Sequence, residues 1–308
     1  MKTFYIIRNK DAADPFISAL EFAGYHRTHN MINADCMFID CEHGGEAKAN
    51  IFEFAKRRPT FAYGHTPYSY FIWDGIYEPA PVACNFVVGD GATMGMKAYG
   101  YPYRVEKIGW TGCQINDFRP TPGTRLLFAP PHLLGNGKYP RPEQYDLVKN
   151  TAMFLSRNLN WFESVVVSCA PQSIMASGLD PLIDGRVEWE YFDAYQAKYP
   201  RKHALSLIWE TDLVISSGTF GYISAATGTP TIMIGYRDWT PGTMSGIAKH
   251  YDLYRSHFAY PLTIEAMTIE EVMAVRTKRN DAVEEWKRLN VGDPFDEDKF
   301  ISIVREYV

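Results

Sequence analysis

The first part of the chain alternates short apolar runs with amphipathic stretches of helical length. The apolar runs, which are typical of buried strands, are residues 3–7, 36–40, 60–63 and 82–88. The stretches with helical periodicity are residues 15–23, residues 47–57 and one that starts near Ala92. Parallel strands need a long crossover between them, so this alternation predicts βαβ units and a mostly parallel sheet.

A second series of the same kind follows a polar segment, residues 113–124, which holds two prolines and a glycine and is typical of a linker. Its predicted strands are residues 125–129, 164–169, 213–216 and 231–234. Its predicted helices are residues 142–158, 200–209, 220–227, 269–276, 281–289 and 296–307. We therefore expect an α/β protein with domains at residues 1–120 and 121–285, followed by a C-terminal helical segment, residues 286–308.

Composition narrows the class of protein. The 308 residues are 46% hydrophobic and carry 31 Lys and Arg against 36 Asp and Glu, a formal charge of −5. These values exclude a disordered chain and a broad cationic field for nucleic acid. The five cysteines are scattered without a C-x-x-C spacing, so they indicate neither a disulfide framework nor a zinc cluster. With no apolar run near ~18 residues and no signal-peptide core, we expect a cytoplasmic protein without a membrane span.

The most informative segment is residues 212–234. A buried strand runs directly into Ser216, Ser217, Gly218 and Thr219, and a helix rich in small residues follows until Gly228 ends it. The first turn of such a helix has unpaired N–H groups and a partial positive charge of about +0.5, which suits phosphate oxygens. Hydroxyls add donors, and Gly218 lets the backbone approach closely. Phosphate binding is favoured over simple helix capping, because four small donor residues exceed what one cap needs.

Three blocks in order resemble the GT-B superfamily of nucleotide-sugar enzymes, and within it the CDP-glycerol glycerophosphotransferases and the UDP-N-acetylglucosamine 2-epimerases. The first block is Ala62-Tyr-Gly-His-Thr-Pro67. The second is Val105-Glu-Lys-Ile-Gly-Trp-Thr-Gly-Cys113, followed by Leu126-Leu-Phe-Ala-Pro-Pro131. The third is residues 212–234. Together they span roughly residues 60–235, and the flanks are similar in architecture only.

The resemblance implies two Rossmann-like domains with parallel sheets that face each other across a cleft, and a C-terminal helix, residues 286–308, that crosses back to the first domain. It implies a glycosyltransferase that moves a sugar from a nucleotide-diphosphate donor to an acceptor hydroxyl, with no cofactor and no bound metal. The alternatives are a CDP-glycerol-type glycerophosphotransferase, a nucleotide-sugar 2-epimerase, a glycosyltransferase acting on hydroxymethylated DNA bases, and a non-catalytic nucleotide-sugar binder. Clustered cations at residues 56–58 keep the DNA alternative open, although the acidic net charge disfavours it.

Two departures from the family pattern affect the donor site. The family often has an acidic residue in the helix after the phosphate loop, where it binds the ribose, but residues 220–226 contain no carboxylate. Glu188 or Glu190 could substitute for it from a neighbouring loop. The family's Thr after Ala-Pro is Pro131 here, with His132 next, in a glycine-rich turn that could approach the donor diphosphate. Arg237, after the last strand, is a further donor-binding candidate.

The first domain offers candidates for catalysis and for the acceptor. His65 follows a predicted strand, and its near-neutral pKa suits a general base that takes the acceptor proton. Asp40, Glu42 and His43 follow another strand, Asp40 as a second catalytic candidate and the other two as acceptor-binding candidates. A metal site at this group is a weaker interpretation, because no second ligand group reinforces it. Residues 87–95 resemble a dinucleotide-binding glycine fingerprint, but we expect these glycines to shape a loop facing the cleft.

Overall fold

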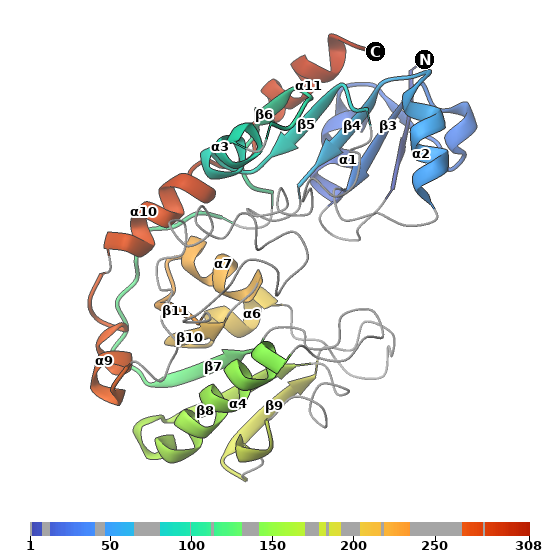
Figure 1. Cartoon of the computed structure of the whole chain (residues 1–308). Helices are drawn as coiled ribbons and strands as arrows, with labels where there is room; N and C mark the ends of the chain where they lie inside the picture. The colour runs from blue at the N-terminus through green and yellow to red at the C-terminus, as the bar shows by residue number, and fades with distance from the viewer. Residues whose placement is uncertain are drawn as a thin grey trace. The chain divides into compact units, whose positions relative to one another are not determined.

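Figure 1 shows the chain as a computed structural model. The structure describes residues 2–7, 13–40, 47–64, 81–98, 100–111, 114–130, 142–169, 179–182, 185–191, 204–216, 219–234, 267–279 and 281–308. Its contacts divide the chain into two compact units. The first holds the described residues of Met1–Ile115 and Lys287–Val308, and the second holds those of Asn116–Trp239 and Phe258–Trp286. The C-terminal segment therefore belongs to the first unit, although it follows the second in sequence.

The described strands of the first unit form a six-stranded, entirely parallel sheet in the order β2-β1-β3-β4-β5-β6. They are β1 (Thr3–Ile6), β2 (His26–Arg27), β3 (Cys36–Asp40), β4 (Thr60–Tyr63), β5 (Cys84–Val87) and β6 (Val105–Lys107). The strand order reverses between β1 and β3, because β2 lies on one side of β1, whereas β3 and the strands that follow it lie on the other side.

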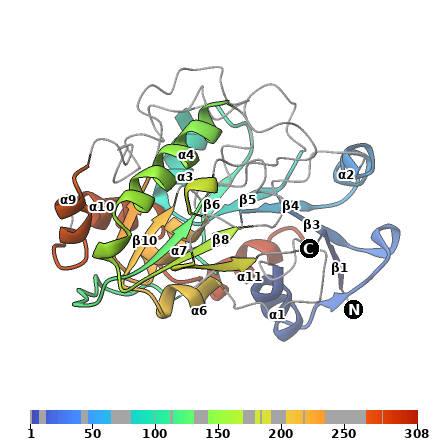
Figure 2. The same cartoon turned by 90° about the horizontal axis from the view of Figure 1, so that it is seen from below.

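The helices of the first unit cover both faces of this sheet. They are α1 (Asp14–Phe22), the short helix η2 (Met31–Asn33), α2 (Ala47–Ala55), α3 (Asp90–Ala98) and α11 (Glu297–Arg305). Figure 2 shows α1 and α11 side by side, and their apolar residues share one core cluster with the inward residues of β1, β3, β4 and β5. α2 packs on the opposite face, where Ile51 and Phe54 meet Met37 and Ile39.

The C-terminal helix contributes the centre of the aromatic core of the first unit. Phe300 of α11 is fully buried, and its ring centroid lies 5.3 Å from that of Phe16, 5.8 Å from Phe38 and 5.0 Å from Phe86. Asp296 caps this helix by accepting a hydrogen bond from the Lys299 amide at 2.9 Å. The C-terminal helix thus completes a core that is otherwise formed by the N-terminal part of the chain.

In the second unit, the described strands form a five-stranded parallel sheet in the order β11-β10-β7-β8-β9. They are β7 (Arg125–Ala129), β8 (Ser164–Cys169), β9 (Val187–Tyr191), β10 (Leu213–Ser216) and β11 (Thr231–Met233). Across the sheet from β9 to β11, the strands are the third, second, first, fourth and fifth strands of this unit in sequence order. This is the order of the first five strands of a dinucleotide-binding Rossmann sheet, and it reverses between β7 and β10.

Helices cover both faces of the second sheet, and successive side chains along each strand point to opposite faces. The helices of this unit are α4 (Pro142–Arg157), η4 (Leu159–Trp161), η5 (Asp180–Leu182), α6 (Ala204–Trp209), α7 (Thr219–Ala226), α9 (Ile269–Ala274) and the first part of α10 (Asp281–Asn290). Leu126 and Phe128 share a cluster with α4, whereas Leu127 and Val214 share one with α6 and α7. Figure 2 shows α4 and α6 on opposite sides of this sheet.

These observations confirm the predicted fold class of an α/β protein with two Rossmann-like parallel sheets. That the two sheets face each other across a cleft stays a prediction. The sequence analysis missed β2 and β6, which have only two or three residues, too few for a period to show. It also missed the five-residue strand β9, which it interpreted as a loop. The helix predicted at residues 200–209 is confirmed over Ala204–Trp209 (α6), and residues 200–203 lie outside the described residues.

An ion pair at the amino edge of the second sheet joins β7 to the start of β10. The Arg125 guanidinium donates to both oxygens of Asp212, at 2.9 and 3.3 Å, and the Arg125 amide donates to the same carboxylate at 3.0 Å. The Asp212 side chain is 7% exposed. Burial opposes ionisation of this carboxyl, but hydrogen bonds from the Arg125 side chain and main chain outweigh it, so its pKa lies below its usual value.

Asp212→Asn is expected to lower the free energy of unfolding of the second unit by about 2 kcal/mol, because it leaves a buried amide in place of a paired carboxylate. Since the pKa of Asp212 is lowered by folding, its contribution is present above the unfolded pKa of about 3.9 and is lost as the pH falls through the folded pKa. The melting temperatures of the wild type and of Asp212→Asn should therefore differ at neutral pH and approach each other as the pH falls below about 4. Asp146→Asn, at an exposed position of α4, is the control and should change nothing.

Candidate functional site

The carboxyl edge of the second sheet carries the strongest candidate site. Ser216, the last residue of β10, pairs in register with Ala129 at the end of β7 and with Met233 at the end of β11. The strand order reverses between β7 and β10, and open parallel sheets bind ligands outside the carboxyl ends of the strands at such a switch point. α7 begins at Thr219, directly beyond this point. The structure thus joins a topological switch point to the start of a helix.

Of the predicted donor-binding residues, three are described. Ser216 closes β10 and is 1% exposed, so its side chain lies inside the unit. Thr219 is the first residue of α7, and Glu190 lies on β9. The other four, Ser217, Gly218, His132 and Arg237, lie outside the described residues. His132 and Arg237 follow the ends of β7 and β11 along the chain, and both strand ends lie beside Ser216.

Glu190 is not in a loop, as the sequence analysis expected, but in strand β9. Val187 is buried and Trp189 is half-buried against the α4 side of the sheet, whereas Glu188 and Glu190 alternate with them on the other face. This alternation of apolar and polar residues is the strand period of two, which the sequence already carried. Glu190 is half-buried, and Glu188 is exposed.

Ser168 is a residue of this edge that the sequence analysis did not select. It pairs in register with Glu190, near the end of β8. Its signal in the sequence was a hydroxyl close to the carboxyl end of an otherwise apolar strand. Its side chain is buried at 4% exposure, and among the described residues its Oγ has no hydrogen-bond partner.

In the first unit, the structure places the strands that carry the predicted catalytic residues side by side. Asp40 is the last residue of β3 and pairs in register with Tyr63, the last residue of β4. His65 comes shortly after Tyr63, and Glu42 and His43 shortly after Asp40, but these three lie outside the described residues. The Tyr63 hydroxyl donates to the Ile7 carbonyl oxygen at 3.1 Å, which ties the ends of β4 and β1 together at this edge.

The glycines of residues 87–95 do not leave room for a dinucleotide. They connect β5 to α3, but a Cβ on Gly89 would overlap the Asn290 carbonyl at the end of α10. A Cβ on Gly91 would meet the Asn290 side chain. These glycines allow the C-terminal segment to pack against the start of α3, where a dinucleotide's pyrophosphate would otherwise bind. Gly89 and Gly91 therefore have a packing role, and the expectation that they also shape a cleft-facing loop stays a prediction.

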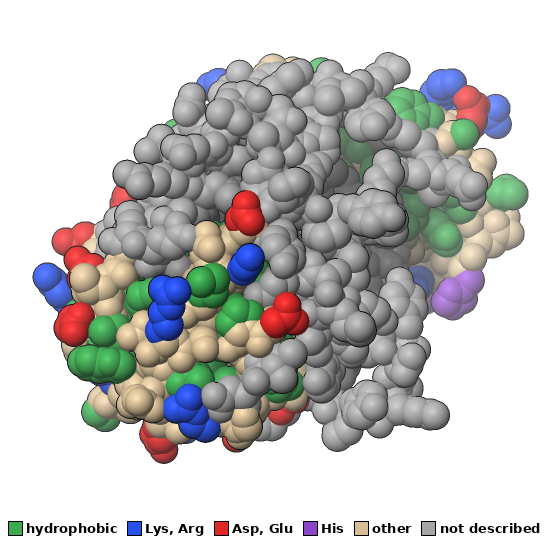
Figure 3. Space-filling view, turned by 60° about the horizontal axis from the view of Figure 1, so that its bottom comes forward, with side chains coloured by type: hydrophobic (Ala, Val, Ile, Leu, Met, Phe, Trp, Pro, Cys, Tyr) green, Lys and Arg blue, Asp and Glu red, His purple; other side chains and the backbone are tan. Residues whose placement is uncertain are grey.

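The cation run at residues 56–58 is largely engaged within the first unit. Lys56 forms an ion pair with Glu53 at 2.7 Å. Arg58 donates to the Ile32 and Ala34 carbonyls and lies over the Phe54 ring at 5.8 Å. On the face that Figure 3 shows, the coloured Lys and Arg side chains are interspersed with Asp and Glu. A nucleic-acid surface gains no support from these contacts.

Other chemistry could come from a metal ion, a membrane-spanning helix or a reactive cysteine in the described part of the chain. There, no group of three or more His, Cys, Asp or Glu could hold a metal ion, and no helix is long and apolar enough to cross a membrane. Burial raises the pKa of both the Cys36 and the Cys84 thiols to about 12, so these two are not thiolate nucleophiles near neutral pH.

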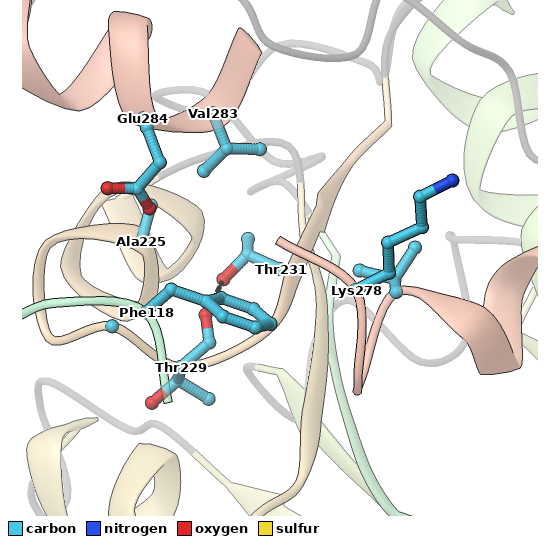
Figure 4. A pocket seen from close by; sticks show the side chains of 9 residues that line it. Phe118, Ala225, Thr229, Thr231, Lys278, Val283 and Glu284 are labelled. Carbon is cyan, nitrogen blue, oxygen red and sulfur yellow. Dashed lines mark hydrogen bonds between the residues drawn. The ribbon is translucent and has the colours of Figure 1, made fainter. Parts of the chain in front are cut away.

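A small pocket of the second unit lies at the amino end of β11, away from the candidate site. Figure 4 shows the Thr229 and Thr231 hydroxyls beside the Phe118 ring, with Glu284 on the helix above and the Lys278 ammonium pointing away. The Thr231 hydroxyl donates to the Thr229 carbonyl at 2.7 Å. The Thr231 hydroxyl is also hydrogen-bonded to the Ser224 hydroxyl of α7 at 2.7 Å, so it helps to hold β11 to α7.

No protein-family model matches the sequence, and no curated protein sequence matches it. Similar solved structures include a mutant of S. aureus TarM in complex with fondaparinux, alpha-GlcNAc-glycerol and UDP, at 9% identity and a TM-score of 0.48. That alignment covers 88% of this chain, which spans 55% of the TarM chain. CalG4, the calicheamicin glycosyltransferase, has 14% identity and a TM-score of 0.46, and the alignment covers 98% of this chain and 81% of the CalG4 chain. E. coli ADP-heptose LPS heptosyltransferase II has 10% identity and a TM-score of 0.33, and the alignment covers 76% of this chain and 84% of the heptosyltransferase chain. TM-scores below 0.5 do not decide the activity of this chain.

Proposed function

We propose that this chain is a GT-B-type glycosyltransferase that moves a sugar from a nucleotide-diphosphate donor to an acceptor hydroxyl. The observation that carries the proposal is the reversal of strand order between β7 and β10, with Ser216 at the strand end and α7 starting at Thr219. Open parallel sheets bind nucleotides at such switch points, and a helix start there favours phosphate.

The donor diphosphate would bind at residues 216–219. Because the Ser216 side chain is buried, its part would be to end the strand at the switch point, while Ser217, Gly218 and Thr219 present backbone N–H groups and hydroxyls to the phosphate oxygens. His132 and Arg237 would add contacts from the segments that follow β7 and β11. Glu190 would contact the nucleoside from β9.

The acceptor would bind at the carboxyl edge of the first sheet. His65 or Asp40 would take the proton from the acceptor hydroxyl while its oxygen forms a bond to the anomeric carbon of the donor sugar. The bond between that carbon and the diphosphate oxygen breaks, and the diphosphate leaves as an anion. The start of α7 and the Arg237 guanidinium would stabilise this anion without a bound metal. Glu42 and His43 would orient the acceptor.

The proposal is tested by calorimetric titration with a panel of nucleoside diphosphates and their sugars. The wild-type chain should bind at least one of them, and Gly218→Asp should weaken this binding at least 100-fold, because a carboxylate would stand where the phosphate binds. Gly185→Asp makes the same change in the same unit, at an exposed glycine with no atom within 4 Å of its added Cβ, and should bind as the wild type does.

Two outcomes would contradict the donor site: no nucleotide binds, or Gly218→Asp binds as tightly as Gly185→Asp. Turnover assays then separate activities that share the donor site. Conversion of a nucleotide-sugar without any acceptor would favour the 2-epimerase, and binding without turnover in any acceptor screen would favour the non-catalytic binder.

A further inference from the structure

A buried hydroxyl without a partner marks the carboxyl edge of β8. Ser168 is 4% exposed, and its Oγ forms no hydrogen bond with the part of the chain that the structure describes. A hydroxyl buried in this way costs free energy, of order 1–3 kcal/mol, and such groups are rare in folded proteins. Ala at this position would avoid that cost, so an explanation is needed for a serine here.

The register of the sheet places Ser168 in one row with the candidate phosphate site. Ser216 pairs with Ala129, and because Phe128 pairs with Val167, the next residues along, Ala129 and Ser168, lie side by side. Ser168 in turn pairs with Glu190. Paired residues of parallel strands point to the same face, so this row lies on the face that α6 and α7 share, the side on which α7 begins.

The distances between the residues of this row are similar to the length of a nucleoside diphosphate. Strands are about 4.8 Å apart, so Ser168 lies about 10 Å from Ser216 and Glu190 lies about 5 Å further. This is of the order of the reach from a terminal phosphate to the ribose of a nucleoside diphosphate. In Rossmann sheets of this strand order, the ribose lies beyond the end of the second strand, which is β8 here.

We propose that Ser168 and Glu190 bind the ribose hydroxyls of the donor, so that the site selects a ribonucleotide over a nucleotide whose sugar lacks these hydroxyls. This inference rests on the proposed function. A serine hydroxyl donates one hydrogen bond and accepts others, and a carboxylate only accepts. The two neighbouring hydroxyls of a ribose can donate to Glu190 and exchange a hydrogen bond with Ser168, which gives the buried Oγ the partner that it lacks. The base of the nucleotide is not specified by this pair.

The inference predicts opposite effects of Ser168→Ala on stability and on binding. Removing a buried hydroxyl without a partner should leave the melting temperature of the free protein unchanged or raise it. The same variant should bind the best ribonucleoside diphosphate of the panel about tenfold more weakly, since one hydrogen bond is lost. A hydroxyl with a merely structural role would instead lower the melting temperature.

The decisive measurement is calorimetric titration with that nucleoside diphosphate and its 2′,3′-dideoxy analogue. The wild type should prefer the ribose form at least tenfold, because a site built for hydroxyls rejects the analogue that lacks them. Ser168→Ala and Glu190→Gln should each bind the dideoxy analogue as the wild type does, and so lose most of this preference. Glu188→Gln, on the same strand and face but two residues from Glu190 toward the amino end, is the matched control and should keep the full preference.

The outcomes separate this inference from the proposed function. If the wild type binds no nucleoside diphosphate, the proposed function fails. If it binds one but does not distinguish the dideoxy analogue, or if Ser168→Ala keeps the preference, only the ribose assignment is wrong. A loss of affinity that is equal for both ligands would also overturn it and would point to the base or the phosphate as the group that Ser168 contacts.

Discussion

Phe300→Ala is expected to lower the free energy of unfolding of the first unit by about 3–5 kcal/mol, the usual cost of removing a large aromatic side chain from a packed core. The Phe300 ring contacts Phe16, Phe38 and Phe86, which come from one helix and two strands. The cavity would therefore open where three elements meet, and the surrounding backbone cannot collapse into it. Thermal unfolding of the whole chain should show the first unit melting roughly 10 °C lower.

Phe22→Ala is the matched control, because Phe22 of α1 is 90% exposed. The same change of side chain there should alter stability by no more than about 0.5 kcal/mol. Equal melting curves for the two variants would show that α11 does not contribute to the core of the first unit. That result would contradict the assignment of Lys287–Val308 to this unit.

Gly228→Ala is expected to destabilise the second unit by about 2–4 kcal/mol. Gly228 has φ of 78°, a conformation that side chains with a Cβ rarely adopt, and the added Cβ would overlap the Asp117 carbonyl oxygen. That carbonyl belongs to the chain segment at which the two units divide, and the Arg119 amide donates to the Gly228 carbonyl at 2.8 Å. The variant should therefore loosen this segment as well as strain the turn after α7.

Gly24→Ala separates the two causes. Gly24 also has a positive φ, of 89°, but no atom lies within 4 Å of an added Cβ. Gly24→Ala should lower the free energy of unfolding only by the conformational cost, about 1 kcal/mol. A Gly228→Ala protein no less stable than Gly24→Ala would show that the contact with Asp117 is absent in solution. Amide hydrogen exchange at Arg119 gives a second, local readout.

Much of the fold could be predicted because its signals are local. A buried parallel strand such as β10 is a continuous apolar run bounded by polar residues, and α7 is bounded by small polar residues before it and Gly228 after it. The capping box of α9, in which Thr268 and Glu271 exchange hydrogen bonds at 2.7 and 3.2 Å, is equally readable from the chain. Residues that are neighbours in sequence decide these features, so no tertiary information is needed.

The candidate site could be predicted only in part. The sequence placed candidates directly after strands, and the carboxyl ends of parallel strands meet at one edge of a sheet, but the roles of these candidates stay predictions. The sequence could not tell which strands would be neighbours, and so it did not associate Ser168 with Glu190. It also could not show that Asn290 packs against Gly89 and Gly91, because these residues lie far apart in the sequence.

The sequence by itself determined the alternation of strands and helices, the parallel sense of both sheets and the segments in which a phosphate site could form. Only the tertiary structure decided the strand orders, which of two switch points lies beside a helix rich in small residues, and the role of Phe300 in the core of the first unit. The physical reason is that helix and strand periods are set by neighbouring residues. Strand order and burial arise instead from contacts between residues up to almost three hundred positions apart, which compete across the whole chain.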